Sequence, residues 1–421
     1  ADGLALFLRD LDTGHVWTAG WRPGDEAYEA RFGVGTVEII RQDAGVETRL
    51  CLAVAPAGAL VGRLQLRSLD GRARRIEVTT LAEVVLHDRA ADASHPAFSK
   101  LFVQTERLDG RPVLLAKRRP RTPEDPSVWL GYWLDDAAAA VSWETDRLRC
   151  VGRGRRRTDP AMMDASGDLG GTVGAVLDPV VALRTVVAVS AEGVATRAFG
   201  LAGGNSREDV SAHADALGDL GAIDLAFRAA SDAEQARRDR LGLDDAAADA
   251  AQSLVGPLLM GDPSLWAPAA LRAAATDGDA LPIDGAGPLV VVRVRTEAGV
   301  GAVRHLAAWQ RYWADLGLPV RLLAVADDPD ALAEEGGPVV GADREAQAAR
   351  LADVWADDAL PVASAKPVML AEGTRPAVPT GDLALDDADL REFNGTGGFS
   401  ADGTEYVMHL RPGTDGRLSL P

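Results

Sequence analysis

The sequence has few of the residues that build metal, redox or membrane sites. Only two cysteines, Cys51 and Cys150, occur in 421 residues. They are far apart and lack metal-ligand spacing, so we expect no metal and a reducing compartment. No signal peptide is visible, and no apolar run approaches the ~18 residues of a membrane helix. The formal net charge of −19 argues against nucleic-acid binding and direct membrane contact, because both favour a basic surface.

The overall composition is that of an ordinary globular protein. Hydrophobic residues make up 47% of the chain and charged residues 25%, which are typical proportions. The length is enough for two or three domains with a large core. The chain starts with ADGLALFLRD, without an initiator Met and already in a strand-like pattern. We therefore expect it to be a piece excised from a longer protein.

Residues 1–228 have the pattern of a large antiparallel β-sandwich. Apolar and polar residues alternate within residues 74–85, as in a strand with one buried face. Turn sequences such as Asp12-Thr13-Gly14 separate the apolar runs, and no helical pattern lies between them. This arrangement predicts a sandwich. Its other strands are expected at residues 4–8, 16–18, 36–41, 48–54, 62–67, 113–118, 127–134, 180–189 and 194–201.

The rest of the chain predicts helices, a small α/β unit and a hairpin, so the fold class is α+β and multidomain. Ser231 followed by Glu234 is a capping-box pattern that predicts a helix start. A strand, a helix and a second strand then predict a parallel βαβ crossover. The expected segments are linking helices at 229–287, the α/β unit at 288–365 (strands 289–294 and 320–325, helix 298–316), a linker at 366–390 and the opening hairpin of a further β-domain at 391–421. Hairpin turns are expected at Asn394-Gly395, Gly397-Gly398 and Asp402-Gly403.

The α/β unit carries little evidence of a nucleotide site. A GxGxxG motif does not follow its first strand, so dinucleotide binding is unsupported and we expect no cofactor. Asp327 and Asp328 come at the carboxyl end of the second strand, where ligands of α/β sheets bind. They suit an exposed turn as well, and we favour the turn.

An arginine-rich stretch is the most unusual feature of so acidic a chain. Trp143, Glu144, Asp146 and Arg147 begin it, and the arginines continue with Arg149, Arg153, Arg155, Arg156 and Arg157. Nearby glycines indicate a fixed loop. The arginines could meet an anionic ligand, or they could form a buried Arg–Asp network that pins the loop to a sheet. We favour the network.

Aromatic residues gather near this stretch and suit carbohydrate. Flat aromatic faces stack on the apolar face of a pyranose ring, and charged side chains can hydrogen-bond to its hydroxyls. Core packing is the alternative, because Trp129 and Trp133 share one face of a regular strand. The candidate carbohydrate-binding residues are Trp129, Tyr132, Trp133, Trp143, Asp146, Arg147 and Arg153.

Several stretches, in a consistent order, resemble one family. They are FLRDLDTGHVWTAGW, HPAFSKLFVQTE, ETDRLRCVGRGR with GGTVGAVLDPVVALR, DALPID and FNGTGGFSADGTEYVM. Together they are similar to the part of cyclic β-1,2-glucan synthases that is related to family-94 glycoside phosphorylases. The resemblance covers nearly the whole chain. It implies a galactose-mutarotase-like sandwich followed by linking helices and, in the full family pattern, a helical (α/α)6 catalytic barrel.

The same resemblance implies partners and a location. β-1,2-Glucan or a related glucan and other modules of the same large synthase would be the partners. The chain would be cytoplasmic, as part of an inner-membrane-bound enzyme. The segment after Ser231 has too few helices for the barrel, and no residue matches the family's general acid. We therefore expect no catalytic residue in this chain.

Three functions remain open. The first, which we favour, is a non-catalytic carbohydrate-binding or scaffolding module that handles linear β-1,2-glucan for adjacent catalytic modules. The second is inverting phosphorolysis of β-1,2-glucan, with Asp146 or Glu144 as the acid and the arginines around phosphate. The third is a purely structural spacer between modules.

Overall fold

The computed structural model describes residues 3–20, 28–122, 124–138, 140–276, 280–332, 335, 337–362, 390–394 and 397–408. The chain divides into two compact units, residues 1–362 and residues 363–421, and each is described by itself. All of the predicted linker but its last residue lies outside the described residues.

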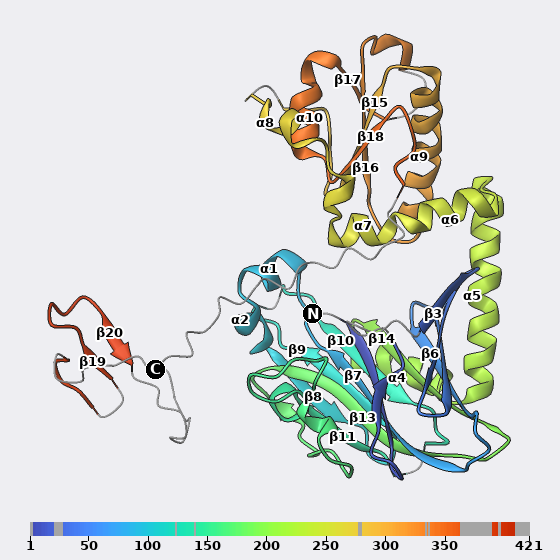
Figure 1. Cartoon of the computed structure of the whole chain (residues 1–421), viewed down its shortest axis with the longest axis vertical. Helices are drawn as coiled ribbons and strands as arrows, with labels where there is room; N and C mark the ends of the chain where they lie inside the picture. The colour runs from blue at the N-terminus through green and yellow to red at the C-terminus, as the bar shows by residue number, and fades with distance from the viewer. Residues whose placement is uncertain are drawn as a thin grey trace. The chain divides into compact units, whose positions relative to one another are not determined.

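Two antiparallel sheets form the predicted sandwich (Figure 1). In spatial order, the five-stranded sheet has β11 (Ser142–Asp146), β13 (Pro179–Val189), β7 (Arg74–Glu83), β1 (Leu4–Asp10) and β2 (Val16–Thr18). The nine-stranded sheet has β12 (Gly174–Ala175), β8 (Val103–Arg107), β9 (Val113–Arg118), β10 (Val128–Leu134), β14 (Val194–Gly204), β6 (Leu60–Ser68), β5 (Val46–Val54), β4 (Thr36–Asp43) and β3 (Tyr28–Gly33). Every strand predicted in this region is confirmed. Strands β3, β8, β11 and β12 were not predicted.

The core lies between the sheets because each strand turns alternate side chains toward it. In β10, Leu130, Tyr132 and Leu134 point inward, whereas Trp129 and Trp133 point to the outer face. Large apolar side chains of both sheets fill the space between them, among them Leu8, Leu50, Leu64, Leu66, Ile76, Val78, Leu114, Leu183 and Phe199. Removing this surface from water is the main stabilising term of the sandwich.

Both outer faces of the sandwich are covered. On the five-stranded sheet, Phe7 and Leu81 pack against Cys150, Met162 and Met163 of the loop that follows β11. This loop contains α3 (Arg147–Cys150). The nine-stranded sheet is covered by α4 (Arg207–Ala216) and α5 (Leu220–Leu241). Two short helices, α1 (Arg89–Ser94) and α2 (Pro96–Lys100), follow β7.

Helix α5 begins well before the predicted helix start. Asp219 is its N-cap and accepts a hydrogen bond from the Ala222 amide at 2.9 Å, and Gly242, in the left-handed conformation, ends it. The capping-box prediction at Ser231 is therefore wrong, because both Ser231 and Glu234 lie inside the helix. The apolar stripe of α5, with Ile223 and Phe227, packs on β5, β6 and β14.

The α/β unit follows three short helices, α6 (Asp245–Ser253), α7 (Val255–Met260) and α8 (Ala269–Ala273). Its parallel sheet has the order β17 (Val339–Gly341), β16 (Arg321–Ala326), β15 (Leu289–Val294) and β18 (Val354–Asp357). Helix α9 (Glu297–Asp315) joins β15 to β16, and α10 (Glu345–Leu351) precedes β18. The predicted parallel βαβ pattern is confirmed.

The second unit contains an antiparallel hairpin of β19 (Gly397–Phe399) and β20 (Tyr406–Met408). The turn predicted at Asp402-Gly403 is confirmed, since Gly403 has a φ of +74° between the strands. The prediction of a turn at Gly397-Gly398 is wrong, because both glycines lie in β19. The predicted turn at Asn394-Gly395 extends into residues outside those described.

Candidate functional site

Three of the four predicted aromatic side chains lie on β10, where they are divided between its two faces. Tyr132 is fully buried between the sheets, and burial raises the pKa of its hydroxyl above the ordinary value. Trp133 is 1% exposed on the outer face, and its Nε1 donates to the Leu217 carbonyl at 3.0 Å. A ring so buried offers no face to a sugar. Tyr132 and Trp133 therefore belong to the core, in agreement with core packing, the alternative to carbohydrate binding.

Trp129 and Trp143 keep part of their surface. Lys117 places its Nζ 5.5 Å from the ring centroid of Trp129. Trp143 lies in the other sheet, and the Arg107 guanidinium carbon is 4.0 Å from its ring centroid. This cation–π contact covers one face of Trp143. The structure therefore separates the four aromatic side chains that were expected to form one cluster.

The acidic residues of the arginine-rich stretch serve the local backbone. Glu144 is buried, and its Oε1 accepts hydrogen bonds from the amides of Thr145 at 2.8 Å and Asp146 at 2.9 Å. Its Oε2 accepts from the Thr172 hydroxyl at 3.1 Å. Asp146 caps α3 by accepting from the Leu148 amide at 2.9 Å. Both carboxylates are engaged in holding the turn between β11 and α3.

The arginines of the stretch form ion pairs, most of them partly exposed. Arg147 donates to Glu83 of β7 at 2.9 Å and lies 3.8 Å from Asp178. Burial alone would raise the pKa of Glu83, but the ion pair with Arg147, together with the nearby charges of Lys100 and Arg157, outweighs burial and lowers it. Arg155 pairs with Asp159 and Asp164, and Arg153 is exposed. The expected Arg–carboxylate contacts are present, but the expected burial is not.

A buried network that the sequence did not predict holds this loop instead. Arg9 of β1, Glu77 of β7 and Arg184 of β13 meet on the outer face of the five-stranded sheet. Glu77 Oε1 lies 3.5 Å from both guanidinium groups. Their remaining donors reach backbone carbonyls of the loop. Arg9 donates to Met163, and Arg184 donates to Met162 at 2.5 Å and to Gly167 at 2.7 Å.

The α/β unit has a topological switch point at the carboxyl ends of β15 and β18. From β15 the chain proceeds to β16 and β17 on one side, and it returns to β18 on the other side. Open parallel sheets usually bind ligands at this position, where a helix N-terminus attracts an anion. The amides of Arg295 and of the N-cap residue Thr296, just before α9, are two of the donors at this edge.

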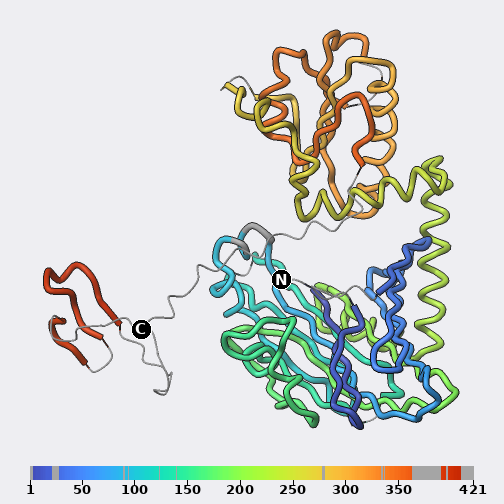
Figure 2. The backbone as a smooth tube through the Cα atoms, viewed as in Figure 1, coloured from blue at the N-terminus to red at the C-terminus, as the bar shows by residue number. Residues whose placement is uncertain are grey.

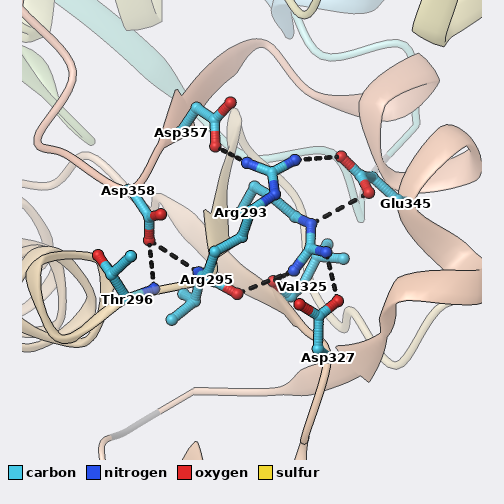
Figure 3. Close-up of polar contacts among 9 residues, drawn as sticks. Arg293, Arg295, Thr296, Val325, Asp327, Glu345, Asp357 and Asp358 are labelled. Carbon is cyan, nitrogen blue, oxygen red and sulfur yellow. Dashed lines mark hydrogen bonds and ion pairs between the residues drawn. The ribbon is translucent and has the colours of Figure 1, made fainter.

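In this chain, a carboxylate of its own occupies those donors. Asp358 Oδ1 accepts from the Arg295 amide at 2.7 Å and from the Thr296 amide at 2.9 Å (Figure 3). Burial opposes ionisation of Asp358, but the two backbone hydrogen bonds prevail and lower its pKa. Gly299 is required nearby, because a Cβ at that position would overlap Asp358.

The two arginines at this edge are also neutralised from within. Arg293 is buried and donates to Asp327 at 2.5 Å and to Glu345 at 3.0 Å (Figure 3). Arg295 donates to Glu345 at 3.2 Å and to Asp357. The switch point is thus closed by internal charges, and Asp327 has a structural partner in Arg293.

A cavity lies elsewhere, between the β3–β4 hairpin and α5. It has a volume of about 630 Å³. Figure 2 shows the blue hairpin beside the yellow-green helix. We call this cavity the α5 groove. It is lined by Arg31, Phe32, Gly33, Thr36, Val37 and Glu38 of the hairpin, Cys51 and Arg63 of the sheet, and Asp224, Phe227, Arg228, Ser231 and Asp232 of α5.

Across the described parts of the chain, no group of three or more His, Cys, Asp or Glu side chains could hold a metal ion. None of the described helices combines the length and the apolar character needed to cross a membrane.

Comparison with known proteins agrees with the sandwich. Residues 1–219 match the family described as "Glycosyl hydrolase 94, supersandwich domain". The chain belongs to this family. The match includes both sheets of the supersandwich and α4, and it ends just before α5. The resemblance inferred from the sequence is therefore confirmed.

One relative extends the likeness beyond the supersandwich. The chain is 28% identical, over 98% of its length, to "Cyclic beta-(1,2)-glucan synthase NdvB" of Rhizobium meliloti (strain 1021). It spans only 16% of that protein.

Solved structures also overlap with parts of the chain. The match to a bacterial glucoamylase complexed with acarbose includes 60% of this chain and 34% of the glucoamylase chain. The sequence identity is 8% and the TM-score is 0.38. The match to a polysaccharide lyase includes 50% of this chain and 27% of the lyase chain, with 14% sequence identity and a TM-score of 0.29.

Proposed function

We propose that this chain is a non-catalytic module of a β-(1,2)-glucan synthase that holds linear glucan for adjacent catalytic modules. The observation that carries the proposal is the likeness to the R. meliloti synthase, which runs through 98% of this chain. The supersandwich, the linking helices and the α/β unit all fall within it. In such an assembly the chain would lie on the cytoplasmic side of an inner-membrane-bound enzyme, beside other modules of the same protein.

The roles of the two candidate acids favour a non-catalytic module. A general acid needs a carboxyl group that can reach the glycosidic oxygen and release its proton there. Both oxygens of Glu144 already accept hydrogen bonds inside the loop, and Asp146 caps α3. Of the predicted aromatic contacts, Trp129 and Trp143 are the two that keep surface for a sugar.

A spacer between modules is the second candidate, and one observation favours it. Helix α5 packs on the sandwich through Phe227 and on α9 through Glu234, which accepts a hydrogen bond from Tyr312 at 2.6 Å. One continuous helix therefore connects the two folded parts of the first unit, as a rigid support would. A support of this kind requires no glucan site.

Calorimetric titration with linear β-1,2-gluco-oligosaccharides of graded length separates these functions. Affinity that rises with length, with no glucose 1-phosphate formed when phosphate is added, is the expected result. No heat at any length would contradict the proposal and leave the spacer. Glucose 1-phosphate above a heat-inactivated control would instead establish phosphorolysis. Trp129→Ala tests whether that ring contributes, with Trp266→Ala, an exposed ring outside the sandwich, as the control.

A further inference from the structure

The α5 groove has the composition of a site for an uncharged, hydroxyl-rich ligand. Its lining carries three arginines and three carboxylates, which balance: Arg31, Arg63 and Arg228 against Glu38, Asp224 and Asp232. A phosphate or another anion would face the carboxylates as well as the arginines. A sugar hydroxyl both donates and accepts, so it can use both kinds of group. The volume of about 630 Å³ is in the range of small-ligand pockets.

The groove also presents an apolar ring at its mouth. Phe32 of the edge strand β3 is 74% exposed, which is unusual for so large an apolar side chain. An aromatic face exposed beside polar groups is the arrangement that stacks on a pyranose ring. Deeper in the groove, Phe227 is buried beneath the Arg63 guanidinium, whose carbon lies 5.1 Å from the ring centroid. Arg63 is held in place by Asp224 at 2.6 Å.

Further polar groups on the helix wall face the same space. Arg228, Ser231 and Asp232 follow one another at helical spacing along α5. The side chains of Arg228 and Asp232 are exposed and make no hydrogen bond or ion pair with any other residue that the structure describes. They can therefore bind a ligand without first breaking such a contact. In this respect these two side chains differ from Arg293 and Arg295 at the switch point of the α/β unit, which already have internal partners.

The shape of the groove depends on one close approach between the hairpin and the helix. Gly35, in the turn between β3 and β4, has a φ of +67°, and a Cβ there would lie 2.7 Å from the Ala230 carbonyl oxygen. The turn thus rests directly on α5 at one end of the groove. Both walls are fixed by backbone, so the site is formed before any ligand arrives, which reduces the ordering cost of binding.

We propose that the α5 groove binds the linear β-glucan, with Phe32 stacking on a glucose ring and Arg228 and Asp232 hydrogen-bonding to its hydroxyls. This inference rests on the proposed function and adds the place where the glucan is held. The occupant is a neutral oligosaccharide, so inorganic phosphate is not expected to compete for the groove.

Calorimetric titration of the whole chain with linear β-1,2-gluco-oligosaccharides tests the groove through matched variants. Stacking of this kind is worth about 1 kcal/mol, so Phe32→Ala should weaken binding about three- to tenfold. Arg228→Gln should weaken it by about the same factor, because each variant removes one side of the site. Leu225→Ala is the control, since Leu225 is 60% exposed on α5 but does not line the groove. Its affinity should equal that of the unmodified chain.

Amide hydrogen exchange gives a second, independent result. Glucan should slow exchange in β3 and β4 of the unmodified chain, and the protection should be lost in Phe32→Ala. If the unmodified chain binds glucan but Phe32→Ala and Arg228→Gln bind it equally well, the groove is overturned while the proposed function stands. If the unmodified chain does not bind glucan at all, both fail. Displacement of glucan by inorganic phosphate would contradict a site for neutral ligands.

Discussion

Tyr312 of α9 donates its hydroxyl hydrogen to Glu234 of α5 at a distance of 2.6 Å, and both side chains are buried. Arg238 holds the same carboxylate oxygen at 3.1 Å, and Gln252 of α6 donates to the tyrosine hydroxyl at 2.9 Å. Three helices thus share one polar cluster. Because α5 also packs on the sandwich, this cluster couples the sandwich to the α/β unit.

Tyr312→Phe should destabilise the first unit. It removes a hydrogen bond to a charged, buried acceptor, which is worth about 2 kcal/mol, and this loss should appear in urea denaturation. Tyr406→Phe in the second unit is the matched control and should leave the unfolding of the first unit unchanged. A Tyr312→Phe variant as stable as the unmodified chain would show that the hydrogen bond from Tyr312 to Glu234 makes no net contribution to the free energy of unfolding.

The same tyrosine should make the first unit sensitive to alkali. Burial, and then the hydrogen bond to Glu234, raises the pKa of Tyr312 above its ordinary value. A raised pKa in the folded state means that the stabilisation is complete below the ordinary tyrosine pKa and is lost as the pH rises toward the folded-state value. Unfolding free energies measured across this alkaline range should therefore fall less steeply in Tyr312→Phe. Equal slopes in both proteins would contradict the shift.

Gly200→Ala should destabilise the sandwich, because the indole of Trp133 fills the space where a Cβ would stand. Overpacking of this kind costs about 1–3 kcal/mol. Gly203→Ala on the same strand is the control, since the nearest atom to its Cβ would be the Trp129 carbonyl oxygen at 3.9 Å. Urea denaturation of both variants measures the difference. Equal stability of the two would mean that Trp133 can move off β14, contrary to its role in the core.

Alternation along the strands made much of the sandwich predictable. The polar and apolar faces of residues such as Glu77 and Val78 follow directly from their order in the chain. The charged network was not predictable in the same way. Arg9 stands opposite Glu77 only because β1 pairs with β7 in one particular register, and Arg184 joins them from a strand more than a hundred residues away. That pairing depends on contacts that no local pattern contains.

The start of α5 and the α5 groove illustrate two other limits of prediction from the sequence. Asp219 followed by Ile223 and Phe227 did carry a cap and an apolar stripe, but the capping-box pattern at Ser231 pointed to a later start. The groove exists because Gly35 brings a hairpin turn onto the Ala230 carbonyl. Its two walls come from β3–β4 and α5, so neither segment alone indicated a site.

Glu77→Gln should strongly destabilise the five-stranded sheet and the loop that covers it. The substitution leaves two buried guanidinium groups, of Arg9 and Arg184, without their shared carboxylate. Breaking a buried ion pair in this way costs about 3–5 kcal/mol, measurable by denaturation. Hydrogen exchange should also accelerate at the Gly167 amide, which donates to Glu77 at 3.1 Å.

Exposed ion pairs provide the comparison for that network. Glu29→Gln breaks the pair with Arg31 on the exposed strand β3 and should leave stability unchanged, because solvent screens such pairs. If Glu77→Gln does not fold, Arg184→Lys tests the same point more mildly, since lysine keeps the charge but not the fork of donors to Met162 and Gly167. Unaltered exchange at Gly167 in that variant would contradict the pinning role of Arg184.

Asp358 should be needed mainly for the start of α9. Its φ of +52° is one that asparagine tolerates better than alanine, and the asparagine side-chain oxygen can still accept from the Arg295 and Thr296 amides. Asp358→Asn should therefore cost less than Asp358→Ala, for which the lost cap is worth about 1 kcal/mol. Thermal unfolding of the two variants gives the order, and an alanine variant as stable as the asparagine variant would contradict it.

The pH dependence of Asp358→Asn tests the charge itself. Because the pKa of Asp358 is lowered in the folded state, its stabilisation is present above the ordinary aspartate pKa and is lost as the pH falls toward the folded-state value. The unmodified chain should thus exceed Asp358→Asn in stability at neutral pH, and the gap should close in acid as the carboxylate is protonated. Equal stability of the two proteins at neutral pH would mean that the side-chain oxygen as an acceptor, which asparagine keeps, and not the negative charge, is what Asp358 supplies at this edge.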